Sequence, residues 1–530
     1  MLPVLTQQEM RAIDHATTES LGISSLDLME NAATTVFEFV RGLRGLDETG
    51  PITVFCGPGN NGGDGAALAR MLVRQGIPTI AVLIGGQRVS EGDAKTNFDR
   101  LRAMSDETIL TVIDIDDDSV SNIDENALSV DRSMLLVDAI FGTGLSRSPV
   151  GGVAKIIETI NQRGRIADGR TPCVSIDIPS GLFADSALTS DCHIEADYTV
   201  TFTAPKLANV MSPAKTSNGN LLIADIGTPE EILRDCEARL SVIESSDALR
   251  WLRATDFTPD SFKNRRGHVL CVTGSVGYEG AAVLSANSAM MSGAGVVTIL
   301  TPSSACGPIA ARVVPEVMVR TFDDTGLGFE LLAEHQRKAD SILVGCGIGL
   351  SEPNRGMLRQ LLQLAECPVV VDADALTLLS PFVKSSKLDG PTLILTPHDG
   401  EFRRMFGIEA GIGEERIANV RAVSLKHGVM MVLKGQSTLV GFPDGRVAIN
   451  PTGNSAVGKA GNGDNLAGII AGFVAQSNAR DGDVELAVLA AVYTAGLAAD
   501  IARERFGERV MLATDVRDAL SDAFVQIEAG

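Results

Sequence analysis

Short β-branched runs alternate with helical segments along most of this 530-residue chain. In the first half, Ile52 to Cys56 reads as a strand, Ala66 to Gln75 as a helix and Thr79 to Ile84 as the next strand. Strands that are separated by helices need crossover connections, and these are right-handed in nearly all parallel sheets. The alternation therefore predicts an α/β protein built on mainly parallel, doubly wound sheets.

The alternation is interrupted once and then restarts. The segment Thr228 to Arg250 is rich in charge and lacks a strand pattern, so we expect a domain boundary there. A chain of this length exceeds the size at which one hydrophobic core stops growing. We therefore expect a first domain over residues 1–228, a linker over 229–250 and a second domain over 251–530.

Further elements are expected on both sides of this boundary. The predicted strands are Met134 to Asp138, Val174 to Asp177, Tyr198 to Thr203, His268 to Thr273, Val296 to Leu300, Ser341 to Val344, Pro368 to Asp372, Thr392 to Thr396 and Val429 to Leu433. The predicted helices are Val153 to Asn161, Ala281 to Ser292, Gly463 to Ala475 and Leu486 to Arg503, and a capping box at Thr6-Gln7-Gln8-Glu9 opens another near the N-terminus.

Composition excludes several classes of function. The formal net charge of −22 and an aromatic content of 4% disfavour nucleic acid and anionic membranes as partners. The eight cysteines form no Cys-x-x-Cys pair, which indicates reduced thiols in a cytoplasmic protein and no structural zinc site. No leader pattern and no run of about 18 apolar residues is evident, so we expect neither secretion nor membrane insertion.

Three strand ends in the first half carry polar groups. They are Asn60-Asn61-Gly62-Gly63-Asp64, then Asp138 followed by Gly142-Thr143-Gly144-Leu145-Ser146-Arg147-Ser148, then Asp177 followed by Pro179-Ser180-Gly181. Any one of them alone is equally well explained by tight turns and helix caps. Since ligands of open α/β sheets bind at the carboxyl ends of the strands, the three together predict a binding site.

A glycine-rich turn in the second half runs through an acid into an apolar helix. Its sequence is Lys459-Ala460-Gly461-Asn462-Gly463-Asp464-Asn465-Leu466-Ala467-Gly468. Glycines let backbone N–H groups converge on an anion, and the helix N-terminus adds its positive dipole end. Asp464 is placed to take a proton from a hydroxyl beside the bound phosphoryl group.

Other strand ends of the second half carry titratable or glycine-rich segments. They are Gly345-Cys346-Gly347, Val371-Asp372-Ala373-Asp374, Thr396-Pro397-His398-Asp399-Gly400-Glu401-Phe402-Arg403-Arg404 and Lys434-Gly435. A lone histidine is more often structural than catalytic, and a lysine at a strand end is often only solvated. Beside Asp399, Glu401 and the Asp464 turn, the functional interpretation of His398 is the better one.

The motifs of the first half resemble the N-terminal domain of the NAD(P)H-hydrate repair enzymes. The resemblance rests on residues 60–65, on Val137-Asp138-Ala139-Ile140-Phe141-Gly142-Thr143-Gly144, on Ser175-Ile176-Asp177-Ile178-Pro179-Ser180-Gly181 and on Leu28-Met29-Glu30-Asn31-Ala32. It implies a Rossmann-like epimerase that interconverts the R and S hydrates of NADH and NADPH. Substrate contacts are then expected at Asn60, Asn61, Gly62, Gly63, Asp64, Gly142, Thr143, Gly144, Leu145, Ser146, Arg147, Ser148 and Asp177.

The same resemblance implies a potassium ion and a catalytic acid. Asn61, Asp138 and Ser180 would hold the potassium ion, and Asp177 would be the acid/base group, with Asp138 as the rival candidate.

From about Asp256 to Phe524 the chain resembles the ribokinase-like dehydratase domain of the same family. The resemblance implies that ADP or ATP drives dehydration of the S hydrate back to NADH or NADPH, with Asp464 as the catalytic base. Hydrate contacts are expected at Ala281, Gly347, His398, Asp399, Gly400, Glu401, Phe402, Arg403, Arg404 and Asp464. Nucleotide contacts are expected at Lys434, Gly435, Gln436, Ser437, Thr438, Asn454, Ser455, Ala456, Val457, Gly458, Lys459, Ala460, Gly461, Asn462 and Gly463, with magnesium accompanying the nucleotide.

Asn462 and Asn465 depart from the family pattern around the catalytic acid. The alternative function is a ribokinase-type kinase of a hydroxymethyl-pyrimidine or a sugar, with the first domain a non-catalytic binding or oligomerisation module. A simple kinase does not need the first domain, which favours hydrated NADH and NADPH as substrates. A fusion of both domains with no targeting segment resembles the bacterial members of the family, which are usually ADP-dependent, so ADP is the expected phosphoryl donor. We further expect a homo-oligomer.

Overall fold

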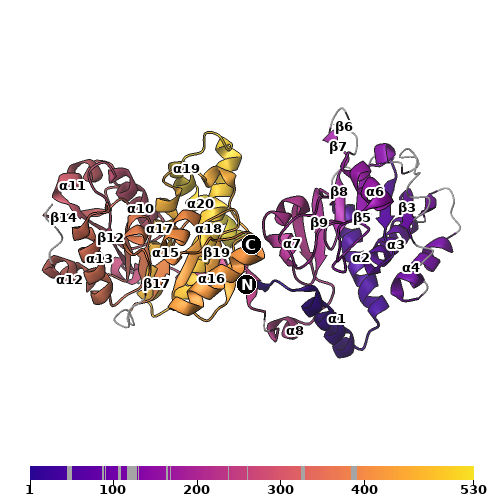
Figure 1. Cartoon of the computed structure of the whole chain (residues 1–530), viewed down its shortest axis with the longest axis horizontal. Coiled ribbons are helices and arrows are strands. Elements are labelled where there is room, and N and C mark those ends of the chain that lie inside the picture. Colours follow the sequence, from indigo (N-terminus) through magenta and orange to yellow (C-terminus); the bar gives the residue numbers. More distant parts are fainter. Residues whose placement is uncertain are drawn as a thin grey trace. The chain divides into compact units, whose positions relative to one another are not determined.

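The computed structural model describes residues 1–43, 50–85, 89, 91–104, 109–115, 128, 130–162, 165–166, 169–236, 238–259, 261–323, 329–383 and 391–530. The chain divides into two compact units (Figure 1). We call Pro3–Ala238 the N-terminal unit, and Arg239–Gly530 together with Met1–Leu2 the C-terminal unit.

The N-terminal unit is built on a parallel sheet with the strand order β10-β9-β8-β5-β2-β3-β4. Its strands are β2 (Ile52–Cys56), β3 (Thr79–Ile84), β4 (Leu110–Ile115), β5 (Leu135–Ala139), β8 (Cys173–Ile176), β9 (Tyr198–Phe202) and β10 (Asn220–Ala224), beside a small hairpin of β6 (Arg165–Ile166) and β7 (Gly169–Arg170). Its helices are α1 (Gln7–Leu21), α2 (Ser25–Gly42), α3 (Asn60–Arg74), α4 (Asp93–Arg102), α6 (Gly151–Asn161), α7 (Leu207–Val210) and α8 (Glu230–Arg234), with 3-10 turns at Val130–Arg132 and Ala214–Asn218.

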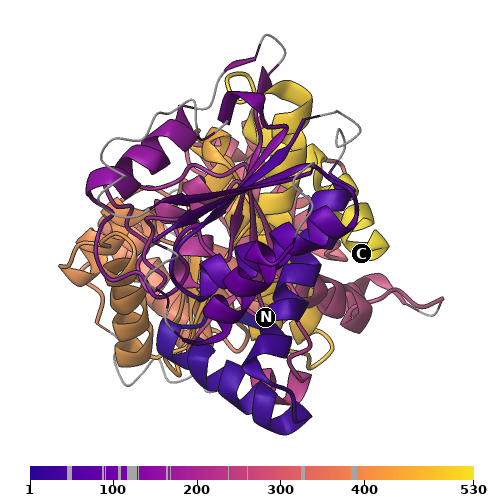
Figure 2. The ribbon, with the colours of Figure 1, turned by 90° about the vertical axis from the view of Figure 1, so that its right-hand side faces the viewer.

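Both faces of this sheet are covered by helices, as the continuous apolar strands predict. Along β2, Val54 and Cys56 belong to a buried cluster shared with α2 and α3, whereas Phe55 belongs to the cluster that Ile156 and Ile160 of α6 join on the other face. Figure 2 shows helices on both sides of the twisted fan of strands. The predicted doubly wound arrangement is confirmed.

The glycine-rich segment after β2 is the first turn of a helix, so the helix expected from Ala66 begins earlier than the sequence predicts. Helix α3 begins at Asn60, six residues before the expected start. A Cβ atom at Gly62 would lie 1.7 Å from the carbonyl oxygen of Gly57, and one at Gly65 would lie 2.6 Å from the Cβ of Ala139. The glycines therefore let the start of α3 pack directly against the strand ends.

The C-terminal unit contains an eleven-stranded sheet with the order β1-β11-β20-β19-β18-β17-β16-β15-β12-β13-β14. Its strands are β1 (Leu2–Pro3), β11 (Leu240–Val242), β12 (His268–Val272), β13 (Val296–Pro302), β14 (Met318–Phe322), β15 (Ser341–Val344), β16 (Val369–Val371), β17 (Leu393–Leu395), β18 (Met430–Leu433), β19 (Leu439–Gly441) and β20 (Val447–Ile449). Strands β12 to β18 pair in parallel, whereas β19 is antiparallel to both of its neighbours.

The helices of this unit cover the sheet. They are α9 (Ser245–Ala254), α10 (Glu279–Met291), α11 (Ser303–Ala310), α12 (Phe329–Gln336), α13 (Glu352–Leu364), α14 (Asp374–Leu378), α15 (Asp399–Phe406), α16 (Glu414–His427), α17 (Asn462–Asn478), α18 (Val484–Phe506), α19 (Ala513–Asp518) and α20 (Leu520–Ala529), with 3-10 turns at Lys263–Arg266 and Ser455–Val457.

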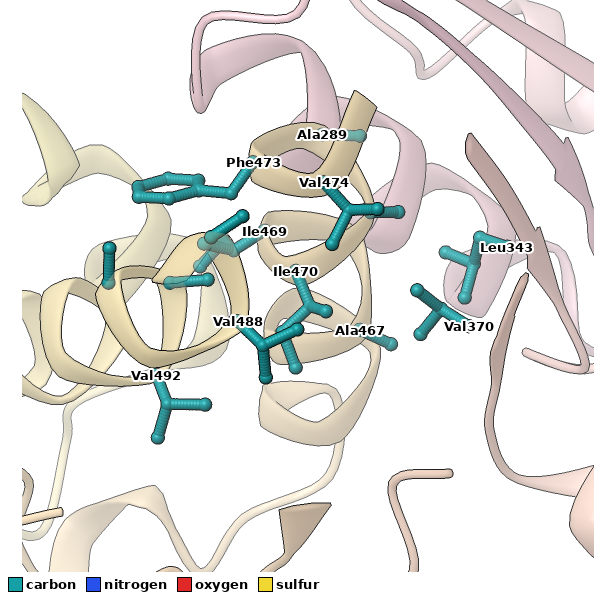
Figure 3. Close-up of a cluster of buried hydrophobic side chains, with 14 of the residues drawn as sticks. Ala289, Leu343, Val370, Ala467, Ile469, Ile470, Phe473, Val474, Val488 and Val492 are labelled. Atoms are coloured by element: carbon teal, nitrogen blue, oxygen red, sulfur yellow. The ribbon is translucent and has the colours of Figure 1, made fainter. Parts of the chain in front are cut away.

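Helix α17 lies at the centre of the core of this unit. Its side chains pack against Leu343 of β15 and Val370 of β16 on one side and against Val488 and Val492 of α18 on the other (Figure 3). Helix α18 is long and apolar enough to cross a membrane by length and composition alone. Because it packs between α17, α9 and α20, its apolar residues are those of a core helix.

The segment expected to be a linker over 229–250 contains regular structure. Strand β11 pairs with β20 in the sheet of the C-terminal unit, and α9 begins at Ser245. The two units separate between Ala238 and Arg239. A three-residue strand in a charged stretch carries too little pattern to be recognised from sequence.

Candidate active sites

The strand order of the N-terminal unit reverses at β2, whose neighbours are β5 and β3. The chain leaves β2 and β5 toward opposite faces of the sheet there, which opens a crevice at their carboxyl ends. A cavity of about 850 Å³ lies at this point and is lined by Pro58 to Asn61 after β2 and by Ile140 to Arg147 after β5. Helix α1 and the ends of β8 and β9 supply the remaining polar wall.

Asp138, at the end of β5, is fully buried beneath this cavity. Its Oδ2 accepts hydrogen bonds of 2.8 Å from the hydroxyl of Ser175 and from the backbone N–H of Ser180, and its Oδ1 accepts from the Ser180 hydroxyl and from the N–H of Ile140. Burial raises the pKa of the Asp138 carboxyl, and these hydrogen bonds offset part of that effect. No described basic side chain forms an ion pair with it.

Asn61 is buried in the first turn of α3, and neither atom of its side-chain amide has a hydrogen-bond partner among the described residues. A buried amide without partners costs free energy comparable to a lost hydrogen bond or more. Asn61 lines the cavity. The amide is therefore oriented for a group that binds there.

Asp177 follows β8 and adopts a left-handed backbone conformation, with φ of 68°. Its Oδ1 accepts a 2.7 Å hydrogen bond from Nζ of Lys206 and a 3.1 Å hydrogen bond from the hydroxyl of Thr201. A Cβ atom at Gly142 would lie 3.2 Å from Oδ2, so the free oxygen faces the glycine segment after β5. Strained backbone at a strand end is typical of functional sites.

Two further carboxyls lie in the wall of this cavity. Burial, together with the negative charges of Asp177 and Asp14, raises the pKa of Asp64 well above its usual range. Burial raises the pKa of Asp14, on α1, to about 6, with Lys206 opposing and Asp177 reinforcing the shift. The cavity thus combines one ion-paired carboxylate with two acids that hold their protons to higher pH.

The structure brings most of the expected epimerase residues into this cavity. Asn60, Asn61, Asp64, Gly142, Thr143, Gly144, Leu145, Ser146, Arg147 and Asp177 line it. Gly62 and Gly63 lie behind them in α3, where a Cβ atom at Gly63 would lie 2.9 Å from the sulfur of Met29. Ser180 lies on Asp138, and Ser148 lies outside the lining.

In the C-terminal unit, the strand order reverses at β12, whose neighbours are β13 and β15. The segments after β12 and β15 meet there: the N–H of Gly274 donates to the carbonyl of Cys346, and the hydroxyl of Ser275 donates to the carbonyl of Gly347. A Cβ atom at Gly347 would lie 3.2 Å from the Cβ of Ala281, so these two predicted hydrate contacts are neighbours.

Asp464, in the first turn of α17, lies close to side chains that follow the strands β15, β16 and β18. One ligand atom each of Asp464, Cys346 and Asp372 lie within 4.8 Å of one another. Nζ of Lys434 lies 2.7 Å from Oδ1 of Asp372, and a Cβ atom at Gly463 would lie 3.4 Å from the same Nζ. Burial, followed by the like charge of Asp372, raises the pKa of Asp464 to about 6.

The segment from His398 to Arg404 is the start of a helix and not a loop. His398 caps α15 by accepting at Nδ1 from the N–H groups of Gly400 and Glu401, while Glu401 accepts from the N–H of His398. Burial raises the pKa of Glu401, with Lys434 opposing the shift. His398 is exposed beside this buried acid, so the histidine has both a capping role and free surface for a ligand.

Among the other residues predicted to contact the hydrate, three form polar contacts with neighbouring side chains and one is buried in the core. Asp399 pairs with Arg416 at 2.7 Å, Arg403 pairs with Glu409 at 3.3 Å, and Arg404 donates to the hydroxyl of Thr377. Phe402 is fully buried against Phe406 in the core.

The predicted nucleotide segment after residue 453 is organised by hydrogen bonds within itself and to residues of α18 and of the stretch between α18 and α19. Asn454 donates to Asp500 at 2.8 Å and accepts from the N–H of Ala456. Lys459 donates from Nζ to the carbonyl oxygens of Arg509 and Met511. The Nδ2 of Asn462 donates to Val457, whereas its Oδ1 is buried without a partner among the described residues.

Of the two residues that depart from the family pattern, Asn462 and Asn465, the second has a structural explanation. Asn465 accepts from the hydroxyl of Ser288 at 2.9 Å and donates to the carbonyl of Ala513. It ties α17 to α10 and to the start of α19.

Sequence reasoning missed Lys206, Asp14 and the role of Asp372 beside Lys434. Lys206 lies just after strand β9, so the rule that polar residues at strand ends form the site could have identified it. Asp14 lies on a helix that precedes the first strand of the unit, and no local pattern places that helix over the cavity.

The fold and these two sites define an enzyme with two α/β units, each carrying buried carboxylates at a topological switch point. The protein-family model described as NAD(P)H-hydrate dehydratase matches residues 269–522 of this chain. The family model described as YjeF-related protein N-terminus matches residues 25–208. The bifunctional NAD(P)H-hydrate repair enzyme of Moorella thermoacetica is 34% identical over 98% of this chain and 96% of its own length. That of Thermofilum pendens is 34% identical over 96% and 93%.

The chain belongs to the family of bifunctional NAD(P)H-hydrate repair enzymes. Among solved structures, the ADP/ATP-dependent NAD(P)H-hydrate dehydratase of Bacillus subtilis, co-crystallised with ATP and Mg²⁺, is 30% identical. It matches 54% of this chain and 99% of its own with a TM-score of 0.48. The full-length matches do not favour the alternative of a simple ribokinase-type kinase.

Proposed function

We propose that the N-terminal unit interconverts the R and S hydrates of NADH and NADPH, and that the C-terminal unit dehydrates the S hydrate at the expense of ADP. The products are NADH or NADPH, AMP and phosphate. The observation that carries the proposal is the presence of two independent carboxylate sites, one around Asp177 and one around Asp464, in a chain that belongs to this family throughout its length.

In the C-terminal unit, Asp464 is the proposed base. Hydroxide is a poor leaving group, so phosphorylation of the C6 hydroxyl converts it into phosphate, which the lone pair of the ring nitrogen can expel. Loss of a proton from C5 of the resulting iminium then forms the C5–C6 double bond of NADH or NADPH. Asp464 takes the hydroxyl proton, while the N–H groups at the start of α17 stabilise the charge on the phosphoryl group. Lys434, held by Asp372, adds a positive charge next to Gly463.

The nucleotide is proposed to bind along residues 434–438 and 454–463, and the hydrate along Ala281, Gly347 and the start of α15. The carboxylates of Asp372 and Asp464 are oxygen donors that suit magnesium, which would offset the negative charge of the nucleotide phosphates. The thiol of Cys346 is a poor ligand for so hard a cation.

In the N-terminal unit, Asp177 is the proposed acid/base group and Asn61, Asp138 and Ser180 the proposed potassium ligands. Two observations support a cation: the unpartnered amide of Asn61, and the buried carboxylate of Asp138 without a described basic partner. Oxygen donors of this kind suit a hard cation. The ion would supply positive charge beneath the bound hydrate.

The proposal is tested by mixing the full chain with hydrated NADH and ADP and following the absorbance of reduced nicotinamide. With a mixture of both epimers, we expect nearly complete recovery. Asp177→Asn should convert only the S portion at the normal rate, because exchange is abolished while dehydration remains. No recovery with ADP or with ATP would refute the dehydratase assignment, and unchanged exchange in Asp177→Asn would refute the role of Asp177.

A further inference from the structure

We infer that Asp14 of α1 is a second acid/base group of the epimerase site and exchanges a proton with the ring nitrogen of the hydrate in the cavity that it shares with Asp177. The inference rests on the epimerase activity proposed above. Asp14 is not among the groups that the sequence motifs single out.

Helix α1 is held firmly over the cavity. A capping box of Thr6 and Glu9 defines its start, and the N–H of Leu5 donates a 3.0 Å hydrogen bond to the carbonyl of Pro205. Met10 and Ile13 are buried together with Ala204 in a small apolar cluster. The helix is therefore anchored on the segment that precedes Lys206.

One face of α1 forms cavity wall. Met10, Arg11, Asp14, His15 and Thr18 line the cavity, and their spacing of three to four residues is that of one helix face. Of these residues, Asp14 is a half-buried carboxyl that interacts with Lys206 and Asp177 through charge, with no hydrogen bond from a described residue among the causes of its shifted pKa. A carboxyl in that position is available to a ligand.

The Lys206 ammonium has no donor left for Asp14. The three N–H bonds of the Lys206 ammonium are directed to Asp177 Oδ1 at 2.7 Å, to the Thr201 hydroxyl at 2.9 Å and to the carbonyl of Phe202 at 3.3 Å. Asp177, in contrast, forms an ion pair with that ammonium. The cavity thus offers one carboxylate that is ion-paired and one carboxyl, Asp14, that is not.

Other charged groups face Asp14 from the surrounding elements. Arg11 and His15 lie on its own helix, Arg147 follows β5, and Asp64 and Asp177 line the same cavity. Burial, opposed by Lys206 and reinforced by Asp177, raises the pKa of Asp14 to about 6, so near neutral pH it gives and regains a proton readily.

This pair of carboxyls matches the chemistry of a carbinolamine. As Asp177 removes the proton of the C6 hydroxyl, the C6–O bond becomes a carbonyl and the C6–N1 electron pair moves to N1, which takes a proton from Asp14. Rotation about C5–C6 turns the other face of the aldehyde toward N1. Ring closure then returns the N1 proton to Asp14 and the Asp177 proton to oxygen, so atoms and electrons balance.

The test measures exchange of the R and S hydrates of NADH by chromatography, with the full chain and without ADP, above the exchange seen without protein. We expect Asp14→Asn to lower kcat at least about 100-fold, as loss of a general acid does, with KM changed less than about threefold. Asp14→Glu should restore part of the rate. Acetate should rescue Asp14→Ala, because a small carboxylic acid can occupy the vacated space.

Glu38→Gln of α2 is the control, because it removes an exposed carboxylate that does not line the cavity and should exchange at the wild-type rate. Exchange by Asp14→Asn within about threefold of wild type would overturn the inference. So would a loss that neither glutamate nor acetate relieves, since that indicates a structural role. Absence of exchange in the wild-type chain would instead refute the proposed epimerase function.

Discussion

Lys434 donates a 2.7 Å hydrogen bond from Nζ to Oδ1 of Asp372, and the pair lies beside the catalytic candidate Asp464. The two residues follow different strands, β18 and β16, and the Asp372 carboxylate is almost completely buried. Thr396 donates a second hydrogen bond of 2.8 Å to the same oxygen. The arrangement fixes a positive charge next to the glycine-rich start of α17.

Asp464→Asn should abolish dehydration and leave epimer exchange intact. The amide cannot accept the hydroxyl proton, and loss of a general base costs about 10²- to 10⁴-fold in rate. The measurement is ADP-dependent recovery of reduced nicotinamide from the purified S hydrate. Asp518→Asn, which changes an exposed aspartate in the same unit, is the matched control. Dehydration by Asp464→Asn within tenfold of wild type would exclude Asp464 as the base.

The rate of dehydration should fall as the pH falls through about 6. The raised pKa of Asp464 means that the ionised form needed for catalysis disappears at a pH well above that of an ordinary aspartate. Asp372→Asn removes a like charge and frees Lys434, and both effects lower the pKa of Asp464. The acid limb of the kcat profile should therefore move to lower pH in Asp372→Asn. A shift to higher pH would contradict this account.

Lys206→Met should destabilise the N-terminal unit by about 3–5 kcal/mol and stop epimer exchange. Removing one partner of a buried ion pair leaves the other charge uncompensated. The double variant Lys206→Met, Asp177→Asn removes both charges, so it should recover most of the stability and none of the exchange. Hydrogen exchange of the β8 and β9 backbone amides reports on stability. Equal destabilisation in the single and double variants would contradict the ion-pair explanation.

Removing potassium should slow epimer exchange, and Asn61→Leu should lose this dependence. Leucine has a similar volume but offers no oxygen to a cation, and it relieves the unpartnered buried amide. Exchange is measured in potassium and in tetramethylammonium salts at equal ionic strength. The control is Glu38→Gln, which should respond to potassium like the wild type. An equal response of Asn61→Leu would exclude Asn61 as a ligand.

Gly468→Ala should destabilise the C-terminal unit by about 1–3 kcal/mol, because its Cβ atom would lie 2.1 Å from the carbonyl oxygen of Ser285 on α10. Gly356→Ala is the matched control: this exposed glycine of α13 has nothing within 4 Å, so alanine should stabilise the helix by about 0.5–1 kcal/mol. The single tryptophan, Trp251, stacks on Phe473 of α17 and reports urea unfolding of this unit. Equal effects of the two substitutions would contradict the packing argument.

Local pattern was enough to locate most of the buried strands. Strands β2, β3 and β15 have the predicted bounds, because β-branched runs flanked by turn residues have no competing interpretation. The short strands β11, β19 and β20 were missed, since three residues show no periodicity and their pairing lies with distant segments. The start of α3 was placed late, because its glycines and asparagines disfavour helix locally and only packing against the strand ends overrides that preference.

The sequence by itself determined the α/β class, the presence of two domains, and the polar groups carried at strand ends, because these depend on periodicity and on turn chemistry. Only the tertiary structure decided which of those groups meet. Strand order brings Lys434, Asp372 and Asp464 together, and it places Lys206 on Asp177. Only the packing of α1 brings Asp14 to the cavity. Contacts between residues so far apart in the chain depend on sheet topology, which no local pattern of residues specifies.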